Sequence, residues 1–201
     1  MPSARRRTHT TPPGYPITYE TSVQLADGRK ATIRPILPSD APELVEAIST
    51  ADPDTLYARF LGGAPPLTET ILDELTKLDY VSRFALVARS GRHGVGIARY
   101  AALPPSDDGS VTADVAVAVA PRWRRIGLAT ALVQLLARRA LECGITDFSA
   151  LFLANNRPVT ALAHASHARV VIAEGRAHLD TPLRTQNQDL PSHDRFREQR
   201  Q

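Results

Sequence analysis

Cysteine, aromatic residues and long apolar runs are all scarce in this 201-residue sequence. Its one cysteine, Cys143, excludes an internal disulfide, which favours a reducing compartment, and we predict the cytoplasm. No stretch approaches the roughly 18 consecutive apolar residues of a membrane-spanning helix, so no membrane association is predicted. The sequence has no zinc-type Cys/His pattern, and its histidines do not have the spacing of metal ligands, so no metal is expected. These histidines include His93, His164, His167, His178 and His193.

Charge of one sign is also scarce, because the net charge is only +3 and much of it lies near the ends. The run Arg5 to Arg7 is not followed by an apolar segment, so neither a secretory nor a twin-arginine signal is expected. Without interleaved aromatics or a basic face, nucleic acid is not an expected partner. We predict a basic tail over 1–16, one folded domain over 17–183 and a polar tail over 184–201.

Strand and helix patterns alternate between the two tails, which predicts a single α/β (α+β) domain. Asp40, Pro42 and Glu43 are typical of a capped helix start, with Glu43 completing a capping box. The pattern predicts hairpins over 24–36, 84–102 and 169–179, strands over 111–119 and 145–153, and helices from 41, over 68–78, over 126–142 and over 158–167.

The most informative segment is 115–130, where an apolar strand runs through a glycine-bearing turn into a long amphipathic helix. The first turn of a helix has unpaired N–H groups and a partial positive charge, so it can hold a pyrophosphate. Gly127 and Ala129 allow phosphates to approach, since larger side chains there would hold them off. The order is Arg124-x-x-Gly127-x-Ala129, and its structural alternative is a basic helix start after a small-residue turn.

The strand before this turn carries one carboxylate, Asp114, among valines and alanines. Alternation places the valines at 111, 115, 117 and 119 on one face and Asp114 with small residues on the other. An aspartate in such a strand is disfavoured unless it has a partner or a task. Two interpretations remain open, a general base in a cleft and an ion-pair partner of Arg99 on the neighbouring strand.

Several motifs together resemble a known family. The Arg124-x-x-Gly127-x-Ala129 order is similar to the coenzyme A loop of the GCN5-related N-acetyltransferase (GNAT) superfamily. Three further segments resemble the catalytic domain of the bacterial Pat-type protein lysine acetyltransferases, over roughly 23–179; they are Leu25 to Ile36 with Asp40, Asp54 to Phe60, and Leu78 to Tyr80 with Phe84 to Ala88.

The resemblance implies a GNAT-like fold, a mixed and mostly antiparallel central sheet flanked by helices, and acetyl-CoA as co-substrate. It makes Asp114 the general base, although the family has the longer glutamate there. It assigns coenzyme contacts to the strand backbone at Val117 and Val119, to the turn residues Arg124, Arg125, Gly127, Leu128, Ala129 and Thr130, and to Asn156.

Two departures concern the helix after Asn156. The tyrosine that many acetyltransferases use as a general acid is Ala163 here, and the usual Gly-Phe pair is His167-Ala168. Acid catalysis is therefore not assigned to any residue.

The function expected from the resemblance is transfer of the acetyl group to the Nε of lysine in metabolic enzymes, acyl-CoA synthetases among them, by a monomer or homodimer. Acetylation of a small amine and non-catalytic coenzyme A binding are the alternatives. Glu69, Asp73 and Asp79 are interpreted either as an acidic lip that attracts lysine or as an ordinary solvated helix face.

Overall fold

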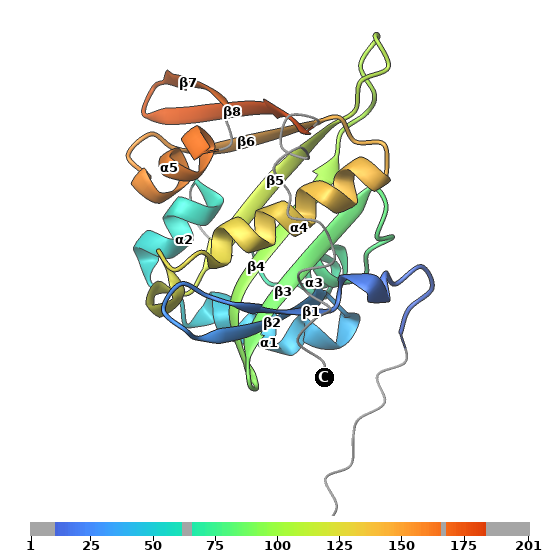
Figure 1. The fold of residues 1–201 in the computed structure, drawn as a ribbon, viewed down its shortest axis with the longest axis vertical. Coiled ribbons are helices and arrows are strands. Elements are labelled where there is room, and N and C mark those ends of the chain that lie inside the picture. The colour runs from blue at the N-terminus through green and yellow to red at the C-terminus, as the bar shows by residue number, and fades with distance from the viewer. Residues whose placement is uncertain (1–10, 62–65, 166–167, 184–201) are drawn as a thin grey trace, which may run out of the picture.

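The computed structural model describes residues 11–61, 66–165 and 168–183, and these ranges form one eight-stranded sheet (Figure 1). The strand order is β1-β2-β3-β4-β5-β6-β8-β7, and every neighbouring pair is antiparallel except β5 and β6, which are parallel. The predicted mixed, mostly antiparallel sheet is confirmed. The strands are β1 (Thr21–Gln24), β2 (Lys30–Pro35), β3 (Arg83–Ser90), β4 (His93–Ala102), β5 (Thr112–Val119), β6 (Asp147–Leu153), β7 (Arg169–Ala173) and β8 (Arg176–Pro182).

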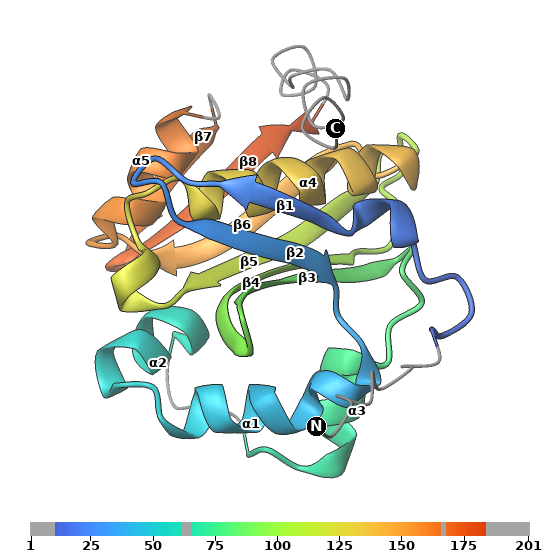
Figure 2. The ribbon, with the colours of Figure 1, turned by 60° about the horizontal axis from the view of Figure 1, so that its bottom comes forward.

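Helices cover both faces of the sheet, α4 and α5 on one and α1, α2 and α3 on the other (Figure 2). Their bounds are α1 (Ala41–Ser49), α2 (Pro53–Phe60), α3 (Glu69–Thr76), α4 (Leu128–Glu142) and α5 (Arg157–Ala165). The core between α4 and the sheet is apolar, with Leu132 and Leu136 fully buried. At Gly96 of β4 a Cβ would lie 3.2 Å from Leu132 Cδ1, so this glycine lets α4 pack closely on the sheet.

The elements predicted from apolar periodicity are confirmed, including the helix that begins at Ala41 and the hairpin that turns at Glu174 and Gly175; the last two residues of the helix predicted over 158–167 lie outside the described residues. One helix, α2, is absent from the prediction. Its start is marked by Asp52, whose carboxylate accepts from Thr55 N at 2.8 Å, and by Pro53 in the first turn. That signal lies in the sequence and could have been found.

The predicted capping box at α1 is wrong. Asp40 accepts hydrogen bonds from Arg34 Nη1 and Nη2 at 2.7 and 2.6 Å and from Leu37 N at 2.8 Å. Glu43 accepts from Gly94 N at 2.6 Å and pairs with Arg89 Nη1 at 2.5 Å. Guanidinium groups are stronger partners than helix amides, so both carboxylates bind α1 to the sheet.

Tyr15, just before the predicted domain start at residue 17, contacts the folded domain. The Tyr15 ring lies edge-on to Tyr80 at 5.6 Å, and Tyr15 Oη donates to Glu20 at 2.8 Å. Tyr15 thus packs against the turn that precedes β3. At the other end Leu183 is fully buried, while the Arg5 to Arg7 run, His167 and the tail over 184–201 lie outside the described residues.

The proposed acidic lip is also accounted for by local bonds. Asp79 accepts from Val81 N and Arg83 N at 2.9 and 2.8 Å, which closes the turn before β3. Asp73 pairs with Lys77 one helical turn later at 2.7 Å. These contacts favour the ordinary solvated-face interpretation over a lysine-attracting lip.

Candidate active site

The sheet forks between its two parallel strands. The ladder between β5 and β6 joins Thr112 to Asp147, Ala113 to Phe148 and Asp114 to Ser149, and it ends there. Beyond this point β5 continues to Val119 and β6 to Leu153, and the two strands diverge (Figure 1). The backbone edge of β5 that faces the fork is thus a place where an extended amide-bearing ligand could add to the sheet.

Two cavities occupy this fork and share Val117, Asn156, Val159 and Leu162 in their walls. The narrower one, about 440 Å³, contains Asp114 in its wall, and the wider one, about 1100 Å³, lies against the start of α4. A continuous site therefore runs from the predicted phosphate turn to the predicted base, as the resemblance implies for a long, extended co-substrate.

The turn before α4 presents amide groups to the wider cavity. Arg125 and Gly127 have positive φ angles of 61° and 92°, and Gly127 is the N-cap with no side-chain cap. The first helical bond runs from Ala131 N to Gly127 O at 3.0 Å, so the N–H groups of Leu128, Ala129 and Thr130 have no partner within the helix. By contrast, α2 and α3 are capped by Asp52 and Thr68. An uncapped helix start beside a cavity fits a pyrophosphate.

Arg124 is directed partly toward α2. Its Nε donates to Val119 O at 3.0 Å and its Nη2 donates to Thr55 Oγ1 at 3.3 Å. The predicted pairing of Val119 with the coenzyme therefore shares its carbonyl with this arginine, and a carbonyl oxygen has lone pairs for two donors. Asp52 lies nearby; its Thr55 hydrogen bonds lower its pKa most, and the positive charge of Arg124 adds to the shift.

Asp114 is exposed and lies on the face of β5 opposite the valines that pack with the α4 core, as alternation predicted. Phe60 and Leu61, at the end of α2, share its cavity. Arg99 pairs with Ala116 in the β4–β5 register, which makes Arg99 a diagonal neighbour of Asp114 on the same face. The register is therefore compatible with both interpretations of Asp114, base and ion-pair partner.

Asn156 lies in the walls of both cavities and also precedes α5. Its Oδ1 accepts from Val159 N at 3.4 Å, the geometry of a helix cap. A structural role and a coenzyme contact are compatible here, since the amide group also has two donors. Ala163, at the position of the family tyrosine, is buried and packs with Phe152 and Leu179.

Residues of α2 were not among the sequence-based candidates, yet they complete the site. Asp52, Thr55 and Tyr57 contribute to the wider cavity, and Phe60 and Leu61 to the narrower one. Their proximity to β5 depends on the chain path between α1 and α3, which periodicity does not encode. Within the described ranges there is no group of three His, Cys, Asp or Glu side chains that could hold a metal, and no helix that is long and apolar enough to cross a membrane.

A strand fork that leads to an uncapped helix start is the architecture of a domain that binds an extended, phosphorylated co-substrate. A model of the acetyltransferase (GNAT) family matches residues 52–167, and the chain belongs to this family. It is 32% identical over 145 residues to the acetyltransferase PA5475 of Pseudomonas aeruginosa, covering 70% of this chain and 76% of that protein.

Two Pat proteins are also similar. The crystal structure of the GNAT domain of S. lividans PAT matches with a TM-score of 0.74 and 28% identity, over 84% of this chain and 99% of that chain. The acetyltransferase Pat of Mycolicibacterium smegmatis is 29% identical over 134 residues. The match covers 67% of this chain and only 40% of that protein's length.

A more distant likeness is to the structure of yncA, a putative acetyltransferase from Salmonella typhimurium solved with its cofactor acetyl-CoA. The identity is 18% and the TM-score 0.59, over 76% of this chain and 94% of that chain. This likeness concerns the fold alone. As a GNAT enzyme, the present chain is an acetyl-CoA-dependent N-acetyltransferase. The unpartnered α4 amides and the forked strands fit that co-substrate, which supplies an acetyl group activated as a thioester.

Proposed function

We propose that this enzyme acetylates the Nε of lysine side chains in proteins, metabolic enzymes of the cytoplasm in particular. The observation that carries the proposal is the likeness to the GNAT domain of S. lividans PAT, which extends over 99% of that chain at 28% identity. The motifs that resemble protein lysine acetyltransferases, in 25–36 and 54–60, lie outside the coenzyme loop, so the likeness is not confined to coenzyme binding.

The chemistry of the narrower cavity supports a lysine acceptor. Its walls are mainly apolar, from residues such as Phe60, Leu61, Leu151 and Phe152, and Asp114 is the one charged side chain among the described residues that form it. Four methylene groups ending in an ammonium fit such a surface, because the stem packs on apolar walls while the charge meets a carboxylate.

In the proposed mechanism the chain positions two reactants and removes one proton. The amides of Leu128, Ala129 and Thr130 hold the pyrophosphate, and the β5 backbone at Val117 binds and polarises the acyl arm. Asp114 holds the ammonium of the acceptor and accepts its proton, so that a neutral amine is presented for attack. An aspartate is one methylene shorter than the family glutamate, so a water molecule is expected between Asp114 and the amine.

The partners follow from the same proposal. Acyl-CoA synthetases and other metabolic enzymes with accessible lysines are the expected protein substrates, and the enzyme acts as a monomer or homodimer. A linear polyamine has the same combination of methylenes and ammonium groups, so acetylation of a small amine is the competing outcome of the test below.

The test compares acceptors directly. Purified enzyme and acetyl-CoA are incubated with folded metabolic enzymes, including an acyl-CoA synthetase, and separately with spermidine and free lysine, while thiol release is followed. Mass spectrometry should find acetyl groups on particular lysines of a folded protein, at a rate above that for the small amines. Thr130→Glu, designed to repel the coenzyme, controls for spontaneous acetylation. Turnover of a small amine far above that of every protein would overturn the proposal.

A further inference from the structure

Three polar side chains lie in a row beside the predicted base, and the sequence-based candidates include none of them. Ser149 Oγ lies 3.3 Å from His178 Nε2, and His178 Nδ1 lies 3.1 Å from Asp180 Oδ2. Ser149 is on β6, and His178 and Asp180 are on β8. We propose that Ser149, His178 and Asp180 form a proton relay that carries the acceptor amine's proton away from Asp114 to solvent.

The register joins this row to Asp114. Ser149 is the partner of Asp114 in the last pair of the β5–β6 ladder, so both side chains project from one face at a strand spacing of about 4.8 Å. On the other side of β6, Ser149 pairs with Asp180, and Leu151 pairs with His178. Leu151 in turn contributes to the cavity that contains Asp114. The three side chains therefore extend from Asp114 on β5, across β6, to β8, on the side of the proposed active site where the acceptor binds.

The hydrogen-bond chemistry determines the direction of the relay. An ionised carboxylate only accepts, so the proposed relay has the imidazole proton on Nδ1, the ring nitrogen that lies 3.1 Å from Asp180 Oδ2. His178 Nε2 is then an acceptor, and the Ser149 hydroxyl is its donor. The oxygen of Ser149 retains lone pairs for a proton that arrives from the Asp114 side. The same arrangement of hydroxyl, imidazole and carboxylate serves nucleophilic catalysis elsewhere, but here it transfers a proton.

The proton balance explains what the relay adds. One C–N bond forms and the thioester C–S bond breaks. The acceptor ammonium loses two protons in all: the first goes to Asp114 before attack, and the second goes from the nitrogen to the thiolate, which leaves as the thiol of coenzyme A. Asp114 passes the first proton to Ser149 Oγ, while the Ser149 hydroxyl proton moves to His178 Nε2. Asp180 stabilises the resulting imidazolium, which returns the proton to water. Imidazole is the side chain most often used as a base in proton transfer, and His178 is the only imidazole in this row.

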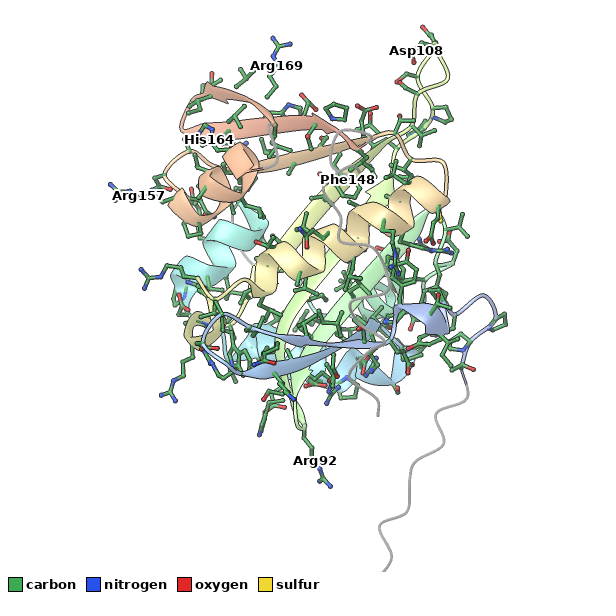
Figure 3. All side chains as sticks on the ribbon, viewed as in Figure 1. Arg92, Asp108, Phe148, Arg157, His164 and Arg169 are labelled. Atoms are coloured by element: carbon green, nitrogen blue, oxygen red, sulfur yellow. The ribbon has the colours of Figure 1, made fainter. Side chains whose placement is uncertain are left out.

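The setting of His178 leaves it accessible to water. Its side chain is 50% exposed, and Leu151 and Val171 flank it on β6 and β7. The charged residues on this face are Asp180 and Arg176 on its own strand, Asp147 on β6, Arg169 opposite Asp180 on β7, and, beyond Ser149, Asp114 on β5 and Arg99 on β4. Figure 3 shows Arg169 extending outward from β7. Solvent can therefore take the proton that His178 releases.

The inference rests on the proposed delivery of the amine to Asp114, whether the amine is lysine or a small molecule. The experiment measures kcat/KM for the fastest acceptor of the screen above, from pH 6 to 9, with saturating acetyl-CoA. His178→Gln and Ser149→Ala should each lower the rate about tenfold at pH 7, and the deficit should shrink as pH rises because solvent deprotonates more amine. The affinity for acetyl-CoA should not change.

A double variant and a matched control sharpen the test. Because a relay acts as a unit, Ser149→Ala/His178→Gln should be no slower than the slower single variant. Arg176→Gln, on the same strand and face as His178, should match the wild type. Wild-type rates in both single variants, a deficit equal at every pH, or additive losses would each overturn the relay. Asp114→Asn separates the two ideas: if it slows the reaction and the relay variants do not, only the relay fails, whereas normal rates in all of them place the amine elsewhere.

Discussion

Arg124 Nη2 donates to Thr55 Oγ1 at 3.3 Å and so joins two segments that are 69 residues apart, the turn before α4 and the helix α2. The same guanidinium holds Val119 O through Nε at 3.0 Å. One side chain thus connects the turn before α4, strand β5 and the helix whose end shares a cavity with Asp114.

Replacement of Arg124 by Met should loosen α2. The contacts are exposed, so the expected loss is only about 0.5–1 kcal/mol and the melting temperature should change little. Hydrogen exchange of the amides between Pro53 and Phe60 should nevertheless become faster. Arg122→Met in the same turn is the control, because its carbonyl, and not its side chain, receives Arg29. Equal exchange in both variants would contradict the connection.

A charge placed at the start of α4 should weaken coenzyme binding without harming the fold. Thr130 is exposed in the first turn, which contains no acidic residue. Thr130→Glu should stabilise the helix by about 0.3–1 kcal/mol through the helix dipole while repelling the pyrophosphate, so the Kd for acetyl-CoA should rise at least about tenfold. Thr130→Gln has nearly the same shape and no charge. If both variants bind acetyl-CoA equally in calorimetry, the phosphates do not lie at this turn.

Substitution of Asp114 separates the base from the ion-pair partner. Asp114→Asn keeps the size and should lower kcat at pH 7 by about 10² to 10⁴-fold, with little change in acetyl-CoA affinity. Asp114→Glu restores the reach of the family glutamate and should retain activity. A wild-type rate for Asp114→Asn from pH 6 to 9 would favour the alternative, an ion pair with Arg99.

Asp40 should make the stability depend on pH under acid conditions. Burial alone would raise its pKa, but the hydrogen bonds from Arg34 and Leu37 and the charge of Arg89 outweigh burial and lower the pKa below 3.8. A group whose pKa is lower in the folded state stabilises the fold above its unfolded pKa. This stabilisation should be lost as the pH falls below about 3.8 toward the folded value.

The matching variant is Asp40→Asn, which leaves Arg34 without its partner carboxylate and Arg89 with Glu43 alone, and it should cost about 3–5 kcal/mol in urea unfolding at pH 7. Its free energy of unfolding should also fall less steeply in acid than that of the wild type. Asp73→Asn, which removes only an exposed pair with Lys77, should cost less than about 1 kcal/mol. Equal costs would show that burial of the Asp40 pair does not matter.

Local pattern was sufficient for most elements of the fold. Alternation in β5 correctly separated Asp114 from the valines, and the glycine-bearing turn predicted the start of α4 to within two residues, at 126 against the observed Leu128. Prediction from local pattern failed where a side chain has a stronger hydrogen-bonding partner far away in the sequence. Asp40 and Glu43 have the spacing of a capping box, yet their carboxylates bind arginines and a backbone amide on neighbouring strands.

The sequence by itself determined the strands, most helices, the family and the turn that can hold a pyrophosphate, because these depend on residues close together in the chain. Tertiary structure alone decided which side chains surround Asp114. The register between β5, β6 and β8 brings Ser149 and His178 to its face, and the fold places Phe60 and Leu61 across the cavity. Such neighbours come from separate segments, and their meeting depends on strand order and register, which no local spacing records.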